Sequence, residues 1–156
     1  ITLAEEFKNS YVSAVDKSPE ALSVATQNAK RIGVSNIAFF EGSWYEPFMT
    51  THADENNKFD IIVSNPPYID PNDPHLAGLT DEPISALIAD NKGMADICHI
   101  VKTAPQFLQP HGLLAIEHGY DQGEQVRGIF LSNGFGDVIT VKDYGDNERV
   151  TLGVIN

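Results

Sequence analysis

The hydrophobic positions of the chain alternate between two periods, and this alternation predicts an α/β domain. Short apolar runs of strand length, each ended by polar or turn-forming residues, occur at residues 11–15, 37–40, 59–64 and 113–117. Apolar residues at helical spacing separate these runs, at residues 1–7, 19–32, 94–108 and 122–132. Strands that alternate with helices in this way predict a doubly wound, mostly parallel sheet.

The two ends of the pattern add detail to this prediction. Residues 1–7 have no helix cap before them, so we expect the chain to begin inside a helix. Strands expected at 138–141 and 150–155 flank the turn-forming Gly145-Asp146-Asn147, which predicts a closing antiparallel hairpin. The polar segment 51–58 and the Pro-, Gly- and Asp-rich segment 69–91 are expected to be loops.

Individual residues indicate where some helices begin and end. Ser18 is a suitable N-cap, Pro19 fits the first helical position, and Glu20 favours the positive end of the helix dipole. Gly33 is expected to stop this helix, and Gly134 the helix of residues 122–132. Pro105 is expected to distort the helix of residues 94–108.

Ligands of doubly wound sheets bind outside the carboxyl ends of the strands, which directs attention to Asp16, Trp44 and the turn 65–68. The Asp16 carboxylate could accept hydrogen bonds from both hydroxyls of a ribose, or could serve only the strand-to-helix turn. The indole face of Trp44 could pack on an adenine ring, or could only fill a groove. Each of these two signals is weak by itself.

Asn65-Pro66-Pro67-Tyr68, directly after the apolar strand of residues 59–64, is the strong signal. The two prolines have no N–H and fix the turn, so the turn presents acceptors without competing donors. A planar NH2 group could donate one hydrogen to the Asn65 side-chain oxygen and one to the Pro66 carbonyl, with the Tyr68 ring against its face. These contacts would favour the reactive geometry of an amide nitrogen for methyl transfer. The alternative is a rigid loop after a buried strand.

Composition narrows the class of protein. Hydrophobic residues make up 42% of the 156 residues and charged residues 21%, as in globular domains of about this length. The net charge is -12 and the ten basic residues are scattered, which disfavours a nucleic-acid substrate. No apolar run of membrane-spanning length and no secretion signal is present in the sequence, and a cytoplasmic protein is expected.

Cysteine and histidine point to no further chemistry. The single cysteine, Cys98, lies in an apolar helical pattern and is expected to be a buried structural thiol. The five histidines lack metal-ligand spacing, so no metal site is expected. The segment Glu117-His118-Gly119 ends a strand and is a weak candidate for contact with a substrate pocket.

Several segments together resemble the HemK/PrmC type of protein-glutamine methyltransferases that act on peptide chain release factors. The similar segments are VSNPPYID (63–70), DPHL (73–76), GMADICHIV (93–101), EHGYDQGEQVR (117–127) and DYGDNERVTLG (143–153). The resemblance implies a class I, Rossmann-like catalytic domain over residues 1–156 whose first strand and Gly-rich cofactor loop would precede Ile1. The sequence differs from that family at Ser43, because the family usually has an acidic residue directly before the tryptophan.

The resemblance also implies the cofactor, the partner and the roles of the site residues. It implies that Asp16, Trp44 and Asn65 contact S-adenosylmethionine, and that the turn 65–68 holds the glutamine of a Gly-Gly-Gln loop of a release factor. Asn65, Pro66 and Tyr68 are then the catalytic residues, and Pro67 is a further substrate contact. Two alternatives stay open: an adenine-N6 methyltransferase on RNA or DNA, and a non-catalytic, truncated domain that binds a partner.

Overall fold

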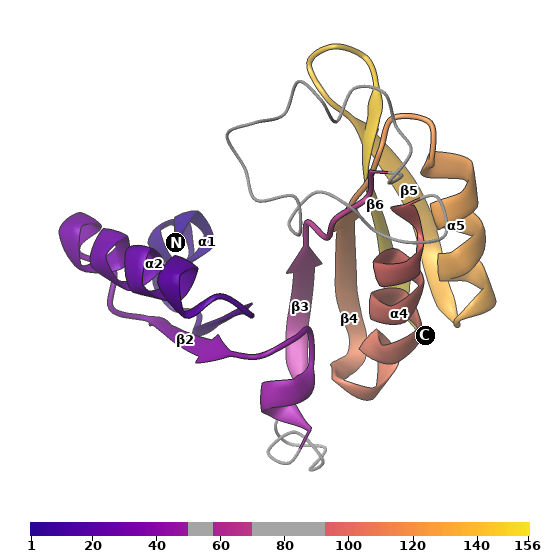
Figure 1. Ribbon diagram of the computed structural model, residues 1–156. Helices are drawn as coiled ribbons and strands as arrows, with labels where there is room; N and C mark the ends of the chain where they lie inside the picture. The colour runs from indigo at the N-terminus through magenta and orange to yellow at the C-terminus, as the bar shows by residue number, and fades with distance from the viewer. Residues whose placement is uncertain (50–57, 70–92) are drawn as a thin grey trace. The chain divides into compact units, whose positions relative to one another are not determined.

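The computed structural model describes residues 1–49, 58–69 and 93–156, which fall into two compact units, Ile1–Asn57 and Lys58–Asn156. The strands of the first unit, β1 and β2, form a two-stranded sheet. The strands of the second unit form a four-stranded sheet of order β3-β4-β6-β5 (Figure 1). The predicted α/β class with a closing antiparallel hairpin is confirmed, and the six strands found among the described residues are divided between two sheets.

The first unit alternates helices and parallel strands. Its elements are α1 (Thr2–Glu6), β1 (Val12–Asp16), α2 (Pro19–Ile32), β2 (Ile37–Glu41) and the short 3-10 helix η1 (Glu46–Phe48). Strands β1 and β2 pair in parallel, with Asp16 opposite Glu41 at their ends. The loops that follow the two strands therefore start at the same edge of the sheet.

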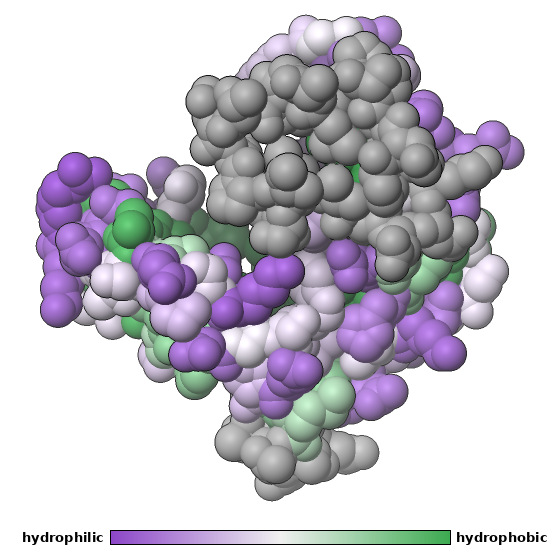
Figure 2. Space-filling view, in the orientation of Figure 1, coloured by the Kyte–Doolittle hydropathy of each residue, from purple (hydrophilic) through white to green (hydrophobic). Residues whose placement is uncertain are grey.

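The ends of α2 are as the sequence predicts. The Ser18 hydroxyl oxygen accepts a hydrogen bond of 3.1 Å from the Ala21 amide, which satisfies one of the unpaired N–H groups of the first turn. Gly33 ends the helix with a left-handed backbone at a φ of 85°, a conformation that costs an L-residue energy and glycine very little. Figure 2 shows mainly hydrophilic residues over the visible side of this helix.

The second unit combines one parallel strand pair with two antiparallel pairs. Its elements are β3 (Phe59–Ser64), α4 (Ala95–Thr103), η5 (Ala104–Gln106), β4 (Leu108–Glu117), α5 (Gly123–Ser132), β5 (Phe135–Lys142) and β6 (Glu148–Ile155). Strand β3 runs parallel to β4, and β6 is antiparallel to both β4 and β5. The carboxyl ends of β3 and β4 thus lie at the same edge as the hairpin between β5 and β6 (Figure 1).

The core of the second unit lies between its helices and its sheet. Helices α4 and α5 contact each other, and α5 packs on β5 and β6. The fully buried residues of this layer come from both helices and from the sheet, and they include Ile97, Val101, Leu114, Ile116, Val126 and Phe130. Gly153 of β6 allows a close approach to α5, because a Cβ there would lie 2.7 Å from a ring carbon of Phe130.

Three expectations about element boundaries were wrong. The predicted helix of residues 94–108 ends at Thr103 and tightens into η5, although the distortion expected at Pro105, which cannot donate a backbone hydrogen bond, is confirmed. Strand β4 begins at Leu108, and its pairing with β3 is interrupted between Leu108 and Leu113, where His111 has a φ of 64°. Strand β5 begins at Phe135 rather than at residue 138.

The predicted loops at 51–58 and 69–91 lie almost entirely outside the described residues. Within the described part of the chain, no helix is long and apolar enough to cross a membrane.

Candidate functional site

Asp16 stands where the sequence placed it, at the carboxyl end of β1. Its Oδ1 accepts a hydrogen bond of 2.8 Å from the Ser18 amide, so the side chain does stabilise the turn into α2. Its Oδ2 has no hydrogen-bond partner among residues 1–49, 58–69 and 93–156, and the residue is exposed. The carboxylate therefore serves the turn and still offers an oxygen to hydroxyl donors.

Trp44 lies in the loop that follows β2, at the same edge as Asp16. The amide of Gly42 donates a hydrogen bond of 3.1 Å to the Asp16 carbonyl, which joins the two loops. Trp44 has a φ of 51°, in the left-handed region that non-glycine residues seldom occupy, and its side chain is half-buried. Backbone strain of this kind tends to collect at ligand sites and persists only where the surroundings enforce it.

The surroundings of Trp44 enforce this conformation. Gly42 packs so closely on Pro47 that a Cβ there would lie 2.7 Å from its ring. Tyr45 and Phe48 are buried, and burial raises the pKa of the Tyr45 hydroxyl far above its usual value, so that it stays protonated. The Glu46 carboxylate accepts a hydrogen bond of 2.8 Å from the Ser43 amide, which brings an acidic group to the position before the tryptophan.

In the second unit, the Asn-Pro-Pro-Tyr turn follows β3 directly. Pro66 is fully buried, whereas Asn65 is exposed. An open cleft of about 300 Å³ lies over the ends of β3 and β4, and it is lined by Val63, Ser64, Asn65, Ala115, Glu117 and Val150. The predicted catalytic Asn65 therefore faces a cleft that also contains a carboxylate.

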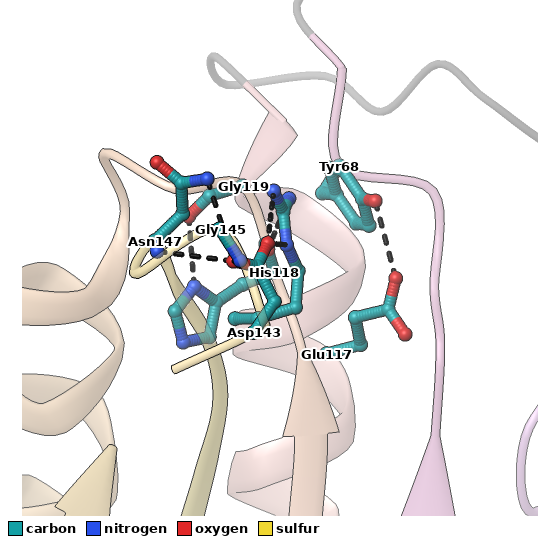
Figure 3. Close-up of polar contacts among 8 residues, drawn as sticks. Tyr68, Glu117, His118, Gly119, Asp143, Gly145 and Asn147 are labelled. Carbon is teal, nitrogen blue, oxygen red and sulfur yellow. Dashed lines mark hydrogen bonds and ion pairs between the residues drawn. The ribbon is translucent and has the colours of Figure 1, made fainter. Parts of the chain in front are cut away.

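Tyr68 is held against the end of β4. Its hydroxyl donates a hydrogen bond of 3.2 Å to Glu117 Oε1, and the two groups point toward each other in Figure 3. Burial of the ring raises the pKa of the Tyr68 hydroxyl, and the charge of Glu117 raises it further. The hydroxyl therefore remains protonated at neutral pH and continues to donate to Glu117.

His118 does not line the cleft, although it follows Glu117 directly. Its side chain is completely buried and takes part in a directed series of hydrogen bonds. Because the Gly119 carbonyl can only accept, Nδ1 donates to it at 2.8 Å, and Nε2 accepts from the Thr151 hydroxyl at 2.9 Å. Thr151 then accepts from Thr140, which accepts from Arg127.

The burial of His118 lowers the pKa of its imidazole, so the ring is neutral in the folded protein. Of the segment Glu117-His118-Gly119, which was expected to contact a substrate pocket, Glu117 lines the cleft beside Asn65 and the buried His118 does not. The hydrogen bonds of His118 fix the carboxyl end of β4, where Glu117 accepts the hydrogen bond from the Tyr68 hydroxyl.

Two further expectations concern cysteine and metal binding. Cys98 is only partly buried and lines an open groove between α4 and α5, so its prediction as a buried thiol was wrong. The helical pattern predicted its element correctly, but the neighbouring surface of α5 leaves the thiol partly uncovered. Among the described residues, no three His, Cys, Asp or Glu side chains gather in a way that could hold a metal ion.

Sequence reasoning missed the residues that support the Asn-Pro-Pro-Tyr turn. Glu117 and Gln122 both bond to Tyr68, through its hydroxyl and its carbonyl respectively. Both belong to the segment EHGYDQGEQVR, which contributed to the resemblance but whose individual roles no pattern revealed. Asp16 and Trp44 belong to the first unit, and the four residues of the turn to the second.

Comparisons with known protein families and sequences agree with this arrangement. A family model described as a methyltransferase domain matches residues 1–135. The chain is 46% identical over 155 residues to the release factor glutamine methyltransferase of Salmonella typhimurium, which covers 98% of this chain and 54% of that relative. It is 44% identical to the protein of the same description from Escherichia coli, with the same coverage. The chain spans about half the length of these curated relatives.

Solved structures share the fold. A methyltransferase from Pyrococcus furiosus superimposes with a TM-score of 0.69 at 20% identity, covering 98% of this chain and 66% of that one. The release-factor-specific protein-(glutamine-N5) methyltransferase from Alicyclobacillus acidocaldarius superimposes with a TM-score of 0.53 at 18% identity, covering 94% of this chain and 80% of that one. At these identities the likeness concerns the fold alone.

Proposed function

The chain belongs to the methyltransferase domain family, and on that premise we propose that it methylates the side-chain amide nitrogen of the glutamine in the Gly-Gly-Gln motif of peptide chain release factors, with S-adenosylmethionine as methyl donor. The observation that carries the proposal is the exposed Asn65 at the cleft beyond β3, followed by a buried proline. The similarity of the chain to release factor glutamine methyltransferases supports this choice of substrate.

The residues of the first unit fit the proposed cofactor. S-adenosylmethionine, when bound, supplies a methyl group on a reactive sulfonium. The exposed Asp16 carboxylate keeps Oδ2 available as an acceptor for the ribose hydroxyls. The half-buried indole of Trp44, fixed by its strained loop, offers an apolar face to an adenine ring. Asn65 is the third residue that we assign to the cofactor.

The turn 65–68 acts on the substrate amide through acceptors. The Asn65 side-chain oxygen accepts one hydrogen of the glutamine NH2 group, and the Pro66 carbonyl accepts the other. Neither Pro66 nor Pro67 has an N–H that could compete for these acceptors. The Tyr68 ring, held by Glu117, packs against the planar amide.

These contacts address the chemical problem of an amide nucleophile. The lone pair of an amide nitrogen is conjugated with the carbonyl, so the nitrogen is a poor nucleophile. Acceptors that hold both hydrogens would favour a pyramidal nitrogen and would stabilise the positive charge that develops on it as the N–C bond forms and the methyl–sulfur bond of the donor breaks. The nitrogen then loses one proton, and no covalent enzyme intermediate is required.

Methyl transfer from radiolabelled S-adenosylmethionine tests the proposal directly. The full-length protein should label a purified release factor, and a release factor whose motif glutamine is replaced by alanine should remain unlabelled. An adenine-containing oligonucleotide serves as the alternative substrate. Labelling of the oligonucleotide alone would replace the proposed substrate, and the absence of labelling on every substrate would favour a binding domain without catalysis.

A further inference from the structure

The side-chain amide of Gln122 binds the last residue of the Asn-Pro-Pro-Tyr turn. Gln122 Nε2 donates a hydrogen bond of 3.0 Å to the Tyr68 carbonyl. The Oε1 of the same amide accepts a hydrogen bond of 2.8 Å from the Gly119 backbone amide. The two partners require different ends of the side chain, so its orientation is fixed: a flipped amide would place donor against donor and acceptor against acceptor.

Gln122 is itself firmly placed. It precedes α5, its own backbone amide donates to the Gly119 carbonyl at 3.0 Å, and its carbonyl accepts from the Val126 amide at 3.0 Å. The β4 end that carries Gly119 is anchored by the buried His118 ring. The Tyr68 carbonyl is therefore tied to a rigid junction between β4 and α5.

The backbone at Gly93 also lies close to the Tyr68 carbonyl. Gly93 has a φ of 76°, and a Cβ on it would lie 1.9 Å from the Tyr68 oxygen and 2.9 Å from Gln122 Nε2. Any side chain at position 93 would thus compete for the space in which the amide and the carbonyl meet. Glu117, two residues before Gly119, holds the other end of Tyr68 through its hydroxyl.

We propose that Gln122 is a positioning residue, which sets the orientation of the acceptors in the turn 65–68 by joining the Tyr68 carbonyl to the β4–α5 junction. Gln122 does not line the cleft beside Asn65, so it acts through the turn rather than on the substrate. A donor is required at this position, because the Tyr68 carbonyl accepts. Gly93 assists by leaving room for the contact. This inference rests on the proposed function for its catalytic consequence.

Gln122→Glu is the sharpest variant, since it keeps the size of the side chain and an acceptor for Gly119 but removes the donor to Tyr68. We expect its kcat for the release factor to fall by about tenfold to a hundredfold, as for other small misplacements of reacting groups. The dissociation constant of S-adenosylmethionine should change much less than kcat, because Asp16 and Trp44, two of the three residues assigned to the cofactor, lie in the first unit. Gln125→Glu makes the same chemical change at an exposed position of α5 and should keep the wild-type kcat.

Gly93→Ala tests the same contact from the other segment and covers the case in which Gln122→Glu does not fold. It should lower kcat in the same way, and the double variant should lose less than the product of the two single effects, because both act on one carbonyl. A wild-type kcat in folded Gln122→Glu or in folded Gly93→Ala would overturn the proposal.

One measurement does not depend on activity and separates this inference from the proposed function. In NMR spectra, the side-chain amide signals of Asn65 should shift in Gln122→Glu and remain in place in Gln125→Glu. If the wild-type protein labels no release factor but Asn65 shifts, the proposed function fails and the positioning role stands. If Asn65 does not shift, the positioning role is wrong whatever the substrate.

Discussion

Asn65 combines exposure with a rigid attachment. Its side chain is exposed at the cleft, while the next residue, Pro66, is completely buried and fixes the backbone. A preorganised acceptor of this kind pays no reorganisation cost during the reaction, which is the main source of electrostatic catalysis. The contribution of Asn65 is therefore expected mainly at the transition state, with a smaller part in binding the cofactor.

Asn65→Ala should lower kcat by roughly a hundredfold, the effect of losing one preorganised partner of a transition state. The affinity for S-adenosylmethionine should fall much less. Asn65→Asp keeps the shape and an acceptor but adds a negative charge near the proposed sulfonium, so it should retain more activity than the alanine variant and bind the cofactor at least as tightly. Steady-state methyl transfer and calorimetry measure the two quantities. Wild-type turnover in both variants would contradict the acceptor mechanism.

Asp16 has two roles that mutation can separate. Asp16→Ala should raise the dissociation constant of S-adenosylmethionine about tenfold, as expected for loss of a hydrogen bond to a charged group. It should also destabilise the turn, because the Ser18 amide loses its partner. Asp16→Asn keeps an acceptor for Ser18, so it should restore thermal stability while cofactor affinity stays weak. An unchanged affinity for S-adenosylmethionine in both variants would show that Asp16 only stabilises the turn.

His118 is expected to make the stability of the protein dependent on pH. Burial lowers the pKa of its imidazole below 6.5, so the unfolded chain binds the proton more readily than the folded one. The free energy of unfolding should therefore be highest above pH 6.5 and fall as the pH decreases below this value. Urea unfolding at a series of pH values measures it. His118→Gln should flatten the decrease, whereas the exposed His99→Gln should leave it unchanged.

At the scale of elements, the contact of β6 with α5 depends on a missing side chain. Gly153 lies where a Cβ would come within 2.7 Å of Phe130 and 3.1 Å of Phe135, whose rings pack at a centroid distance of 5.1 Å. Aromatic rings in a closely packed layer cannot move away without cost. The close approach of strand and helix thus requires glycine at this position.

Gly153→Ala should lower the free energy of unfolding by about 1–3 kcal/mol through overpacking. Gly128→Ala is the matched control on α5, because no atom lies within 4 Å of a Cβ at that position. It should raise the free energy of unfolding by about 0.5–1 kcal/mol, since alanine favours the helix. Denaturant titrations of both variants measure the difference. An equal effect of the two substitutions would show that the Phe130 contact is not limiting.

At the scale of the whole molecule, the net charge supports a prediction about partners. The net charge is -12, and the ten basic residues form no cluster in the sequence. A protein that binds nucleic acid needs a basic surface to displace the cations around the phosphates. A protein substrate places no such demand on the surface of the enzyme.

We therefore expect no binding of a single-stranded or double-stranded oligonucleotide in fluorescence anisotropy, even at low salt where such contacts are strongest. The release factor should bind under the same conditions. Saturable oligonucleotide binding that weakens steeply with salt would contradict the expectation and favour the adenine-N6 alternative. The same measurement with a release factor at several salt concentrations shows how much of its affinity is electrostatic.

The sequence by itself determined the local structure and the main chemical signal. Capping residues, glycines and apolar periods act over a few positions, which is why the bounds of α2 and β3 were predicted almost to the residue. Asn65-Pro66-Pro67-Tyr68 was recognisable because its chemistry lies within four consecutive residues. The bounds of α4 and β4 were less predictable, because strand pairing across the bulge near His111 extends β4 beyond its apolar run.

Only the tertiary structure decided which residues hold the Asn-Pro-Pro-Tyr turn in place. Gly93, Glu117 and Gln122 meet Tyr68 from segments 25 to 54 positions away, and contacts over such separations leave no period in the sequence. Burial distinguished His118, which fixes the end of β4, from its neighbour Glu117, which faces the cleft. The physical reason is general: local patterns specify elements, whereas the environment of a side chain depends on which distant elements pack beside it.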